Sequence, residues 1–338
     1  MLCQMDSQIN ISKRWFAIVN PVAGKGKGLT DWPVISTLLH EAGIEVDALF
    51  TQRKHHATEL AVYAVGKGYR KIIIIGGDGT IHETVHGLFL QQRVATADVL
   101  LAVIAVGTGN DWMRMYGIPN TYSDAVRSIV QGHTFLQDVG RVTYWESKVC
   151  QRRYLANVGG IAYDAAVCRG FNKLKDNGYR GKWLYIWSAA REACRFRSRQ
   201  ARIVADGKEV FNGKLFTATI GICKYTGGGM SQTPYAVADD GLFDMTVIPS
   251  MNRVRLFSRF RTLYTNNIYN ITGVNLIRAG RIVVECDHPI QVELDGEILG
   301  EADFTFEIVP RAVRAIVSKN FVKLNEYGTT QAATQKKG

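Results

Sequence analysis

The sequence lacks any apolar run long enough to cross a membrane as a helix. A span needs about 20 apolar residues, whereas the best uncharged run, residues 99–110, is shorter and ends in Gly107, Thr108, Gly109 and Asn110. The first 14 residues contain no apolar stretch of the kind that secretory signals carry. We therefore expect a cytoplasmic protein without a membrane-spanning helix.

Cysteine is scarce and scattered. The chain has 6 cysteines in 338 residues, and none forms a C-x-x-C pair. In a chain of this length the pattern argues against a disulfide framework and favours reduced thiols that pack as small apolar residues. Their positions are Cys3, Cys150, Cys168, Cys194, Cys223 and Cys286.

The overall composition is that of a globular protein. Apolar residues make up 46% and charged residues 21%, which excludes disorder, collagen and coiled coil for the chain as a whole. The length favours two domains. A formal net charge of +11 indicates an anionic partner, such as a nucleotide, a nucleic acid or an anionic membrane.

The first third alternates strand and helix patterns. Apolar runs at 15–19, 72–75 and 100–106 each lead into a Gly-rich turn, and helix patterns lie at about 31–41, 57–65 and up to about 90. The run at 72–75 consists of four isoleucines, which is typical of a parallel strand buried on both faces. The pattern predicts an α/β, Rossmann-like domain with a doubly wound parallel sheet, over residues 1–138.

The pattern changes after about Gln137. Alternating segments are separated by turn signals such as Asp206-Gly207, Asn212-Gly213 and Asp295-Gly296. They predict an antiparallel β-sandwich domain over 139–326, with a helix at about 181–196 and a last segment that can return to the first domain. The polar tail, 327–338, is expected to be disordered.

The three Gly-rich turns are candidate phosphate sites. Turns at the carboxyl ends of parallel strands line the ligand crevice of such a sheet, and glycine lets backbone N–H groups approach phosphate closely. Asp78 and Asp111 in two of these turns suggest Mg²⁺ shared with a nucleotide. Lys25 and Lys27 either add cationic contacts or are solvated loop charges. The first turn is no Walker A motif, because that motif needs Gly-Lys followed by Ser or Thr, and Lys27-Gly28-Leu29 does not supply it.

These motifs together resemble a known family. Asn20-Pro-Val-Ala-Gly24, Gly76-Gly-Asp-Gly-Thr80 and Gly107-Thr-Gly-Asn-Asp111 resemble the nucleotide-site motifs of the diacylglycerol kinase catalytic family, most of all its soluble bacterial lipid kinases. The turn at 239–244 and Leu294-Asp-Gly-Glu297 resemble two further family motifs. The likeness extends over about residues 14–318.

The resemblance implies roles for individual positions. Asp295 would be the general base that takes the proton of the lipid hydroxyl, with Glu297 as its close support. The acidic network around the catalytic Mg²⁺ would be Asp78, Asp111 and Asp138. A second, structural Mg²⁺ would be held by Asp240 and the carbonyls of Val237 and Leu242. The nucleotide would be contacted by Asn20, Gly24, Lys25, Gly76, Gly77, Gly79, Thr80, Glu83, Gly107 and Thr108.

The sequence departs from the family pattern at two positions. His82 stands where relatives usually have asparagine, which could alter nucleotide contacts. Trp112 stands where many have phenylalanine.

The expected activity is that of an ATP- and Mg²⁺-dependent lipid kinase. Diacylglycerol, converted to phosphatidic acid, is the first expectation for the substrate. A sphingoid base, ceramide or phosphatidylglycerol is the alternative within the family, and NAD is the alternative with a soluble acceptor. A non-enzymatic membrane or nucleic-acid binder would not need the acidic residues.

The segment His82-Glu83-Thr-Val-His86 is a literal HExxH motif. On a helix it would place two histidines on one face for Zn²⁺, so a zinc metalloprotease is a rival hypothesis. The motif directly follows a phosphate-type turn, and the remaining histidines offer no obvious third ligand. A nucleotide-domain helix is therefore the preferred interpretation.

Residues 169–208 are strongly basic. They contain 11 basic and 3 acidic residues, with aromatic residues between them. This composition suits an anionic membrane surface, from which a lipid substrate would be taken. A solvated helix face is the plain alternative, and nucleic acid is not expected as a partner. A homodimer is left open.

Overall fold

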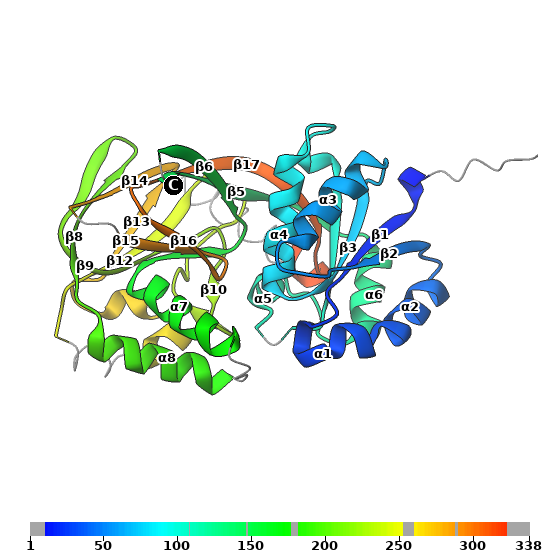
Figure 1. Ribbon diagram of the computed structural model, residues 1–338, viewed down its shortest axis with the longest axis horizontal. Helices are drawn as coiled ribbons and strands as arrows, with labels where there is room; N and C mark the ends of the chain where they lie inside the picture. Colours follow the sequence, from blue (N-terminus) through cyan, green and yellow to red (C-terminus); the bar gives the residue numbers. More distant parts are fainter. Residues whose placement is uncertain are drawn as a thin grey trace, which may run out of the picture.

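The computed structural model describes residues 11–107, 109–146, 148–176, 182–252, 260–287 and 290–322. Figure 1 shows two lobes side by side. The long strands β5 (Thr134–Glu146) and β17 (Phe304–Ile316) run between them. Among the described residues, no helix is both long enough and apolar enough to cross a bilayer.

The N-terminal lobe contains the expected parallel sheet. Its strands are β1 (Trp15–Val19), β2 (Val46–Phe50), β3 (Lys71–Gly76) and β4 (Leu100–Ala105). They pair in the order β2-β1-β3-β4, and β17 continues the sheet in parallel beside β4. The predicted α/β fold class is confirmed.

Helices cover both faces of this sheet, and the isoleucines of β3 show why. Ile72 and Ile74 pack towards α3 (His56–Gly66) and α4 (Asp78–Leu90). Ile73 and Ile75 pack towards α2 (Trp32–Glu41) and α6 (Tyr122–Gln131). All four side chains are fully buried. Successive strand residues point to opposite faces, so an unbroken apolar run needs a helical layer on each side.

The turn regions add shorter elements to this lobe. The first Gly-rich segment, expected as a loop, lies within α1 (Ala23–Thr30), where residues 24–26 have left-handed backbone. The third turn leads into the short helix α5 (Asp111–Met115). The 3₁₀ turns are η1 (Ile11–Lys13), η2 (Thr96–Asp98), η3 (Phe260–Tyr264) and η4 (Ile268–Asn270), of which the last two belong to the other lobe.

The C-terminal lobe is built from antiparallel strands with two helices on one side (Figure 1). The helices are α7 (Tyr163–Asp176), which the sequence analysis missed, and α8 (Lys182–Arg195), which it expected. The strands are β6 (Val149–Leu155), β7 (Val158–Ala162), β8 (Arg199–Ala205), β9 (Lys208–Gly221), β10 (Tyr225–Thr226), β11 (Met230–Ser231), β12 (Phe243–Pro249), β13 (Asn275–Ala279), β14 (Arg281–Cys286), β15 (Ile290–Leu294) and β16 (Glu297–Ala302).

Two of the three predicted hairpin turns form. Asp206-Gly207 joins β8 to β9, and Asp295-Gly296 joins β15 to β16. The turn expected at Asn212-Gly213 is absent, because both residues lie inside β9 and pair with β8. Continuous pairing with the neighbouring strand overrides the local turn preference of this dipeptide.

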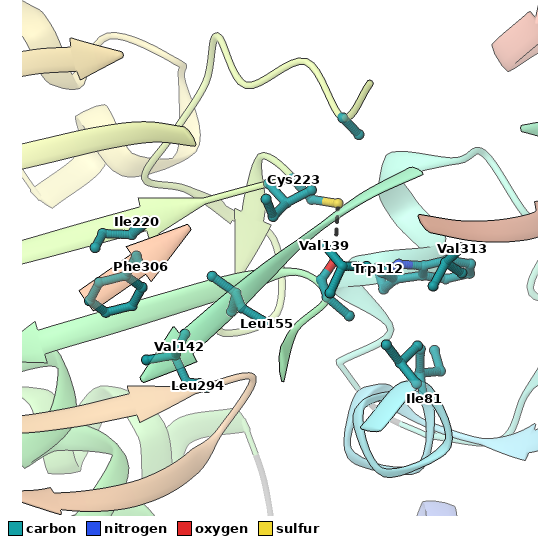
Figure 2. Packing of buried hydrophobic residues seen from close by; sticks show 14 of the residues in the cluster. Ile81, Trp112, Val139, Val142, Leu155, Ile220, Cys223, Leu294, Phe306 and Val313 are labelled. Carbon is teal, nitrogen blue, oxygen red and sulfur yellow. Dashed lines mark hydrogen bonds between the residues drawn. The ribbon is translucent and has the colours of Figure 1, made fainter. Parts of the chain in front are cut away.

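The lobes share one hydrophobic core. Figure 2 shows Ile81 and Trp112 from the first lobe in the same cluster as Val142, Leu294 and Phe306 from the second. The expected domain boundary at 138 falls inside β5, which passes through this cluster. The two lobes are therefore joined by continuous side-chain packing.

Candidate active site

The three Gly-rich turns meet at the carboxyl edge of the parallel sheet. A Cβ added to Gly107 would lie 2.9 Å from the Cα of Gly77, and one added to Gly24 would lie 1.9 Å from the carbonyl oxygen of Val106. Only glycine allows backbone segments to come this close. Gly24 and Gly107 are therefore positions at which these turns come into close backbone contact.

A pocket of about 750 Å³ opens beside these turns, within the usual size range of small-ligand sites. Gly24, Lys25 and Gly107, all predicted nucleotide contacts, line it. Arg114 and Tyr122 also line it, and the sequence analysis did not single them out. Arg114 lies one turn after Asp111 on α5, a spacing that could have indicated it.

The first and second turns are tied together by side chains. The Asn20 Nδ2 donates to Thr80 Oγ1 at 2.9 Å, and the Asn20 Oδ1 accepts from the backbone N–H of Val22. Thr80 lies in the first turn of α4, just after Gly76, Gly77 and Gly79. The predicted contact Thr108 lies outside the described residues.

The carboxylates of Asp78 and Asp111 both lie beside Gly109 of the third turn. A Cβ on Gly109 would be 3.1 Å from Asp78 Oδ2 and 3.8 Å from Asp111 Oδ2. The Asp78 carboxylate accepts from the backbone N–H groups of Asp111 and Trp112 at the start of α5. Burial and the neighbouring Asp111 raise the pKa of Asp78 to about 6. The two carboxylates are close enough to repel each other.

Asp111 also contacts the second lobe. Its Oδ2 accepts from the backbone N–H of Gly228 in the second lobe at 2.7 Å. The Arg114 guanidinium lies 3.7 Å from its Oδ1.

The β15–β16 hairpin places Asp295 beside α4 of the first lobe. The Asp295 side chain is only 2% exposed. Its carboxylate accepts hydrogen bonds from the backbone N–H groups of residues 156–158, at 2.8–3.0 Å. Its Oδ2 also lies 2.8 Å from Nδ1 of His82 on α4. A buried carboxylate needs such donors to remain charged.

His82 lies between two carboxylates. Its Nδ1 faces Asp295, and its Nε2 lies 3.3 Å from Oε2 of Glu297. Burial alone would lower the pKa of His82, but the hydrogen bonds to Asp295 and Glu297 raise it to about 10. Burial would likewise raise the pKa of Glu297, but the hydrogen bond from His82 lowers it to about 2. At neutral pH the group is therefore an imidazolium between two carboxylates.

Known proteins with the same sequence features and fold complete the description. Residues 14–142 match the family model of the diacylglycerol kinase catalytic domain, and residues 158–317 match that of the YegS C-terminal NAD kinase beta sandwich-like domain. A diacylglycerol kinase of Mycobacterium tuberculosis is 28% identical over 301 residues, which cover 89% of this chain and 94% of the relative. One from Staphylococcus aureus is 27% identical over 317 residues, 92% of this chain and 94% of the relative.

The chain belongs to the diacylglycerol kinase family of lipid kinases.

Solved structures show the family fold. The crystal structure of a diacylglycerol kinase from Bacillus anthracis has a TM-score of 0.66 at 21% identity and covers 91% of this chain and 98% of that one. A yeast NADH kinase has a TM-score of 0.51 at 11% identity, covering 90% of this chain and 84% of that one. The two kinases share the architecture of this chain.

Two residues that the resemblance assigned to the site have other contacts here. The Glu83 carboxylate accepts from the backbone N–H groups of His55 and Ala57, at the start of α3, instead of lining the nucleotide pocket. It thereby satisfies N–H groups that a helix start leaves unpaired. In this member of the family, HExxH is therefore a helix-packing segment: His82 faces carboxylates, and Glu83 caps a neighbouring helix.

Asp138 belongs to a separate acidic group. Its carboxylate accepts from the backbone N–H groups of Gly241 and Arg311, and burial raises its pKa. Its charged neighbours include Asp240, Arg311 and Asp239. In this kinase Asp138 therefore joins the 239–242 turn to the bend in β17.

The carboxylate expected to help hold a structural Mg²⁺ lies beside an arginine in this structure. Asp240 accepts from the backbone N–H of Leu242 and pairs with Arg278, which also donates to buried Asp244. The Arg278 guanidinium thus supplies a positive charge to this turn, and the Mg²⁺ site stays a prediction.

We expect Asp240→Ala to lower the melting temperature by the same few degrees with Mg²⁺ and with a chelator present. Arg278→Met should lower it more, because Asp244 is then buried without its partner, at a cost of about 3–5 kcal/mol. Differential scanning calorimetry measures both. A loss seen only when Mg²⁺ is present would restore the metal interpretation.

Proposed function

We propose that this lipid kinase transfers the γ-phosphate of ATP to the hydroxyl of diacylglycerol, giving phosphatidic acid. One observation carries the proposal: helix α4 begins at the Gly77–Thr80 turn beside the nucleotide pocket and, one turn later, presents His82 to the Asp295 and Glu297 carboxylates. Helix α4 would thus contact both the bound phosphates, at its first turn, and the hairpin carboxylates, through His82. The names of the relatives support diacylglycerol as the acceptor.

Asp78 and Asp111 fit a divalent cation. Both carboxylates lie close to Gly109, and the pKa of Asp78 is raised partly by repulsion from Asp111. A cation would relieve this repulsion. We propose that the two residues hold Mg²⁺, which would neutralise charge on the nucleotide phosphates.

The chain's own groups would do the positioning. The backbone N–H groups of the Gly-rich turns would bind the phosphates, with Lys25 and Arg114 as cationic contacts from the pocket wall. The hairpin carboxylates would receive the proton of the acceptor hydroxyl. Phosphoryl transfer depends mainly on such positioning and on charge stabilisation.

We expect labelled phosphate to move from [γ-³²P]ATP to diacylglycerol in mixed micelles when Mg²⁺ is present. Sphingoid base, ceramide, phosphatidylglycerol and NAD are offered in separate reactions. Asp295→Asn should abolish transfer and also lower the melting temperature, because an amide has one oxygen to offer where residues 156–158 and His82 need two. Glu209→Gln, on the exposed β9, is the matched control.

Label in another acceptor would replace diacylglycerol as the substrate. No label in any acceptor would contradict the proposed kinase activity of this chain.

We also propose that the C-terminal lobe rests on an anionic membrane surface. A pocket of about 290 Å³ near α7 and α8 has an apolar floor and an arginine-rich rim. None of the rim arginines forms an ion pair with a described residue, so their charge is available to lipid phosphates. The floor includes Ala162, Ala166 and Ile290, and the rim Arg169, Arg195, Arg197 and Arg199.

Reversing the charge at Arg195, Arg197 and Arg199 should weaken binding to vesicles that contain phosphatidylglycerol by at least about 100-fold, since each cation contributes about 1 kcal/mol. Vesicles of phosphatidylcholine alone should show no such difference. Reversal at exposed Lys13, Lys67 and Arg93 on the other lobe is the control. Unchanged sedimentation with phosphatidylglycerol vesicles would place the contact surface elsewhere.

A further inference from the structure

The turn of the β15–β16 hairpin is held by more than the Asp295 side chain. The turn consists of Asp295 and Gly296, with φ of 50° and 91°, between the last residue of β15 and the first of β16, which pair with each other. Positive φ at both central residues is typical of a tight hairpin turn. The main-chain groups of Gly296 lie outside the strand pairing, so each needs another partner.

Both main-chain groups of Gly296 have side-chain partners. Its N–H donates to Oε2 of Glu293 on β15 at 2.8 Å. Its carbonyl oxygen accepts from Nδ2 of Asn172 at 3.0 Å and from the thiol of Cys168 at 3.2 Å. These two donors are four residues apart on α7, so they lie on the same face of that helix. Helix α7 therefore contacts the main chain of the turn directly.

These contacts orient the two peptide units that meet at Gly296. A peptide unit is planar, so a partner on its N–H or its C=O restricts the orientation of the whole unit. Glu293 contacts the unit between Asp295 and Gly296, and α7 contacts the unit between Gly296 and Glu297. The second unit ends at the Cα of Glu297. Its orientation therefore sets the direction in which the Glu297 side chain leaves the main chain.

We propose that Asn172 and Cys168 are positioning residues for phosphoryl transfer, because they hold the Gly296 carbonyl and thereby the turn that carries the hairpin carboxylates. This inference rests on the proposed function, and it holds whichever of the two carboxylates receives the proton. His82 contacts the same carboxylates from α4, at 2.8 and 3.3 Å. The turn is thus held by the first lobe through its side chains and by α7 through its main chain.

Asn172 is the better of the two positions for a test. An amide N–H is a stronger donor than a thiol, which is a weak one. The Asn172 amide also lies 3.6 Å from the sulfur of Cys168, so it contacts both the carbonyl and the second donor. Cys168 is buried, whereas Asn172 is only partly buried. A substitution at Asn172 therefore disturbs the packing of the lobe less.

The decisive comparison is Asn172→Asp against Asn172→Gln. Aspartate has nearly the shape of asparagine but places a second oxygen against the Gly296 carbonyl, where glutamine retains an amide donor. We expect Asn172→Asp to lower kcat by about 10- to 100-fold, the cost of a displacement of about 1 Å at a reacting group. The KM for ATP should not change, because first-lobe residues line the nucleotide pocket. Asn172→Gln should retain most of the wild-type kcat.

Two further variants separate positioning from charge and folding. Lys214→Gln, at an exposed position of β9, changes the net charge by the same amount as Asn172→Asp and should leave kcat unchanged. Asn172→Ala removes the donor without adding a charge, so it should lower kcat by a smaller factor, and it replaces Asn172→Asp if that variant does not fold. Wild-type kcat in the folded variants that lack the donor, or equal losses in Asn172→Asp and Asn172→Gln, would overturn the proposal.

One measurement does not depend on activity. Glycine with ¹³C at its carbonyl and glutamate with ¹⁵N together select the Gly-Glu peptides, of which the chain has two, Gly296-Glu297 and Gly300-Glu301. In the nuclear magnetic resonance spectrum, one of these two signals should move in Asn172→Asp and return towards its wild-type position in Asn172→Gln. Two unmoved signals in Asn172→Asp would overturn the contact with the turn.

The outcomes also separate this inference from the proposed function. Wild-type protein that labels no acceptor would contradict the proposed kinase activity. Active wild type together with fully active Asn172→Asp would overturn the positioning role alone.

Discussion

The hydrogen bonds to the Asp295 carboxylate are the constraint on which the site depends. A buried carboxylate without donors is strongly destabilising. Here the donors come from the break between β6 and β7 and from helix α4 of the other lobe. Asp295 has a left-handed backbone, with φ of 50°, at the position where the hairpin reverses direction, and its side chain faces these donors. Satisfying one charge therefore fixes three chain segments relative to one another.

The shared core makes this arrangement rigid. Gln137 on β5 accepts from the indole of Trp112 and the hydroxyl of Tyr116, and it donates to the carbonyl of Ala156. All of these groups are buried within the cluster that joins the lobes. The segment that anchors Asp295 is thus connected, through Gln137, to the helix that follows the third Gly-rich turn.

The sequence was most informative where chemistry is local. Four successive isoleucines predicted β3 and a helical layer on each face, because strand periodicity alone requires it. The Gly-rich turns predicted backbone that can approach phosphate closely; in the structure, Gly77 and Gly107 approach each other. Asp206-Gly207 turns as expected, but Asn212-Gly213 does not, since pairing with β8 decides its conformation.

Contacts between distant residues could not be read in this way. His82 and Asp295 are 213 positions apart, and their meeting depends on how the lobes pack. A family motif likewise shows which residue types recur but not what each one touches. Glu83, assigned by the resemblance to the nucleotide, accepts from N–H groups at the start of α3, and Asp138, assigned to the acidic network, accepts from Gly241 of the 239–242 turn. Helix α7, which was missed, follows directly after β7.

The acidic residues discussed here form three groups, which differ in the positively charged groups that they contact. Asp295 and Glu297 have an internal cation, His82, and Asp240 and Asp244 have another, Arg278. Asp78 and Asp111 lie close together: the Asp78 carboxylate accepts from backbone N–H groups at the start of α5, and Asp111 accepts from the N–H of Gly228 and lies 3.7 Å from the Arg114 guanidinium. This is the pair for which a bound cation is proposed above. The carboxylates of the β15–β16 hairpin pair instead with His82 of α4.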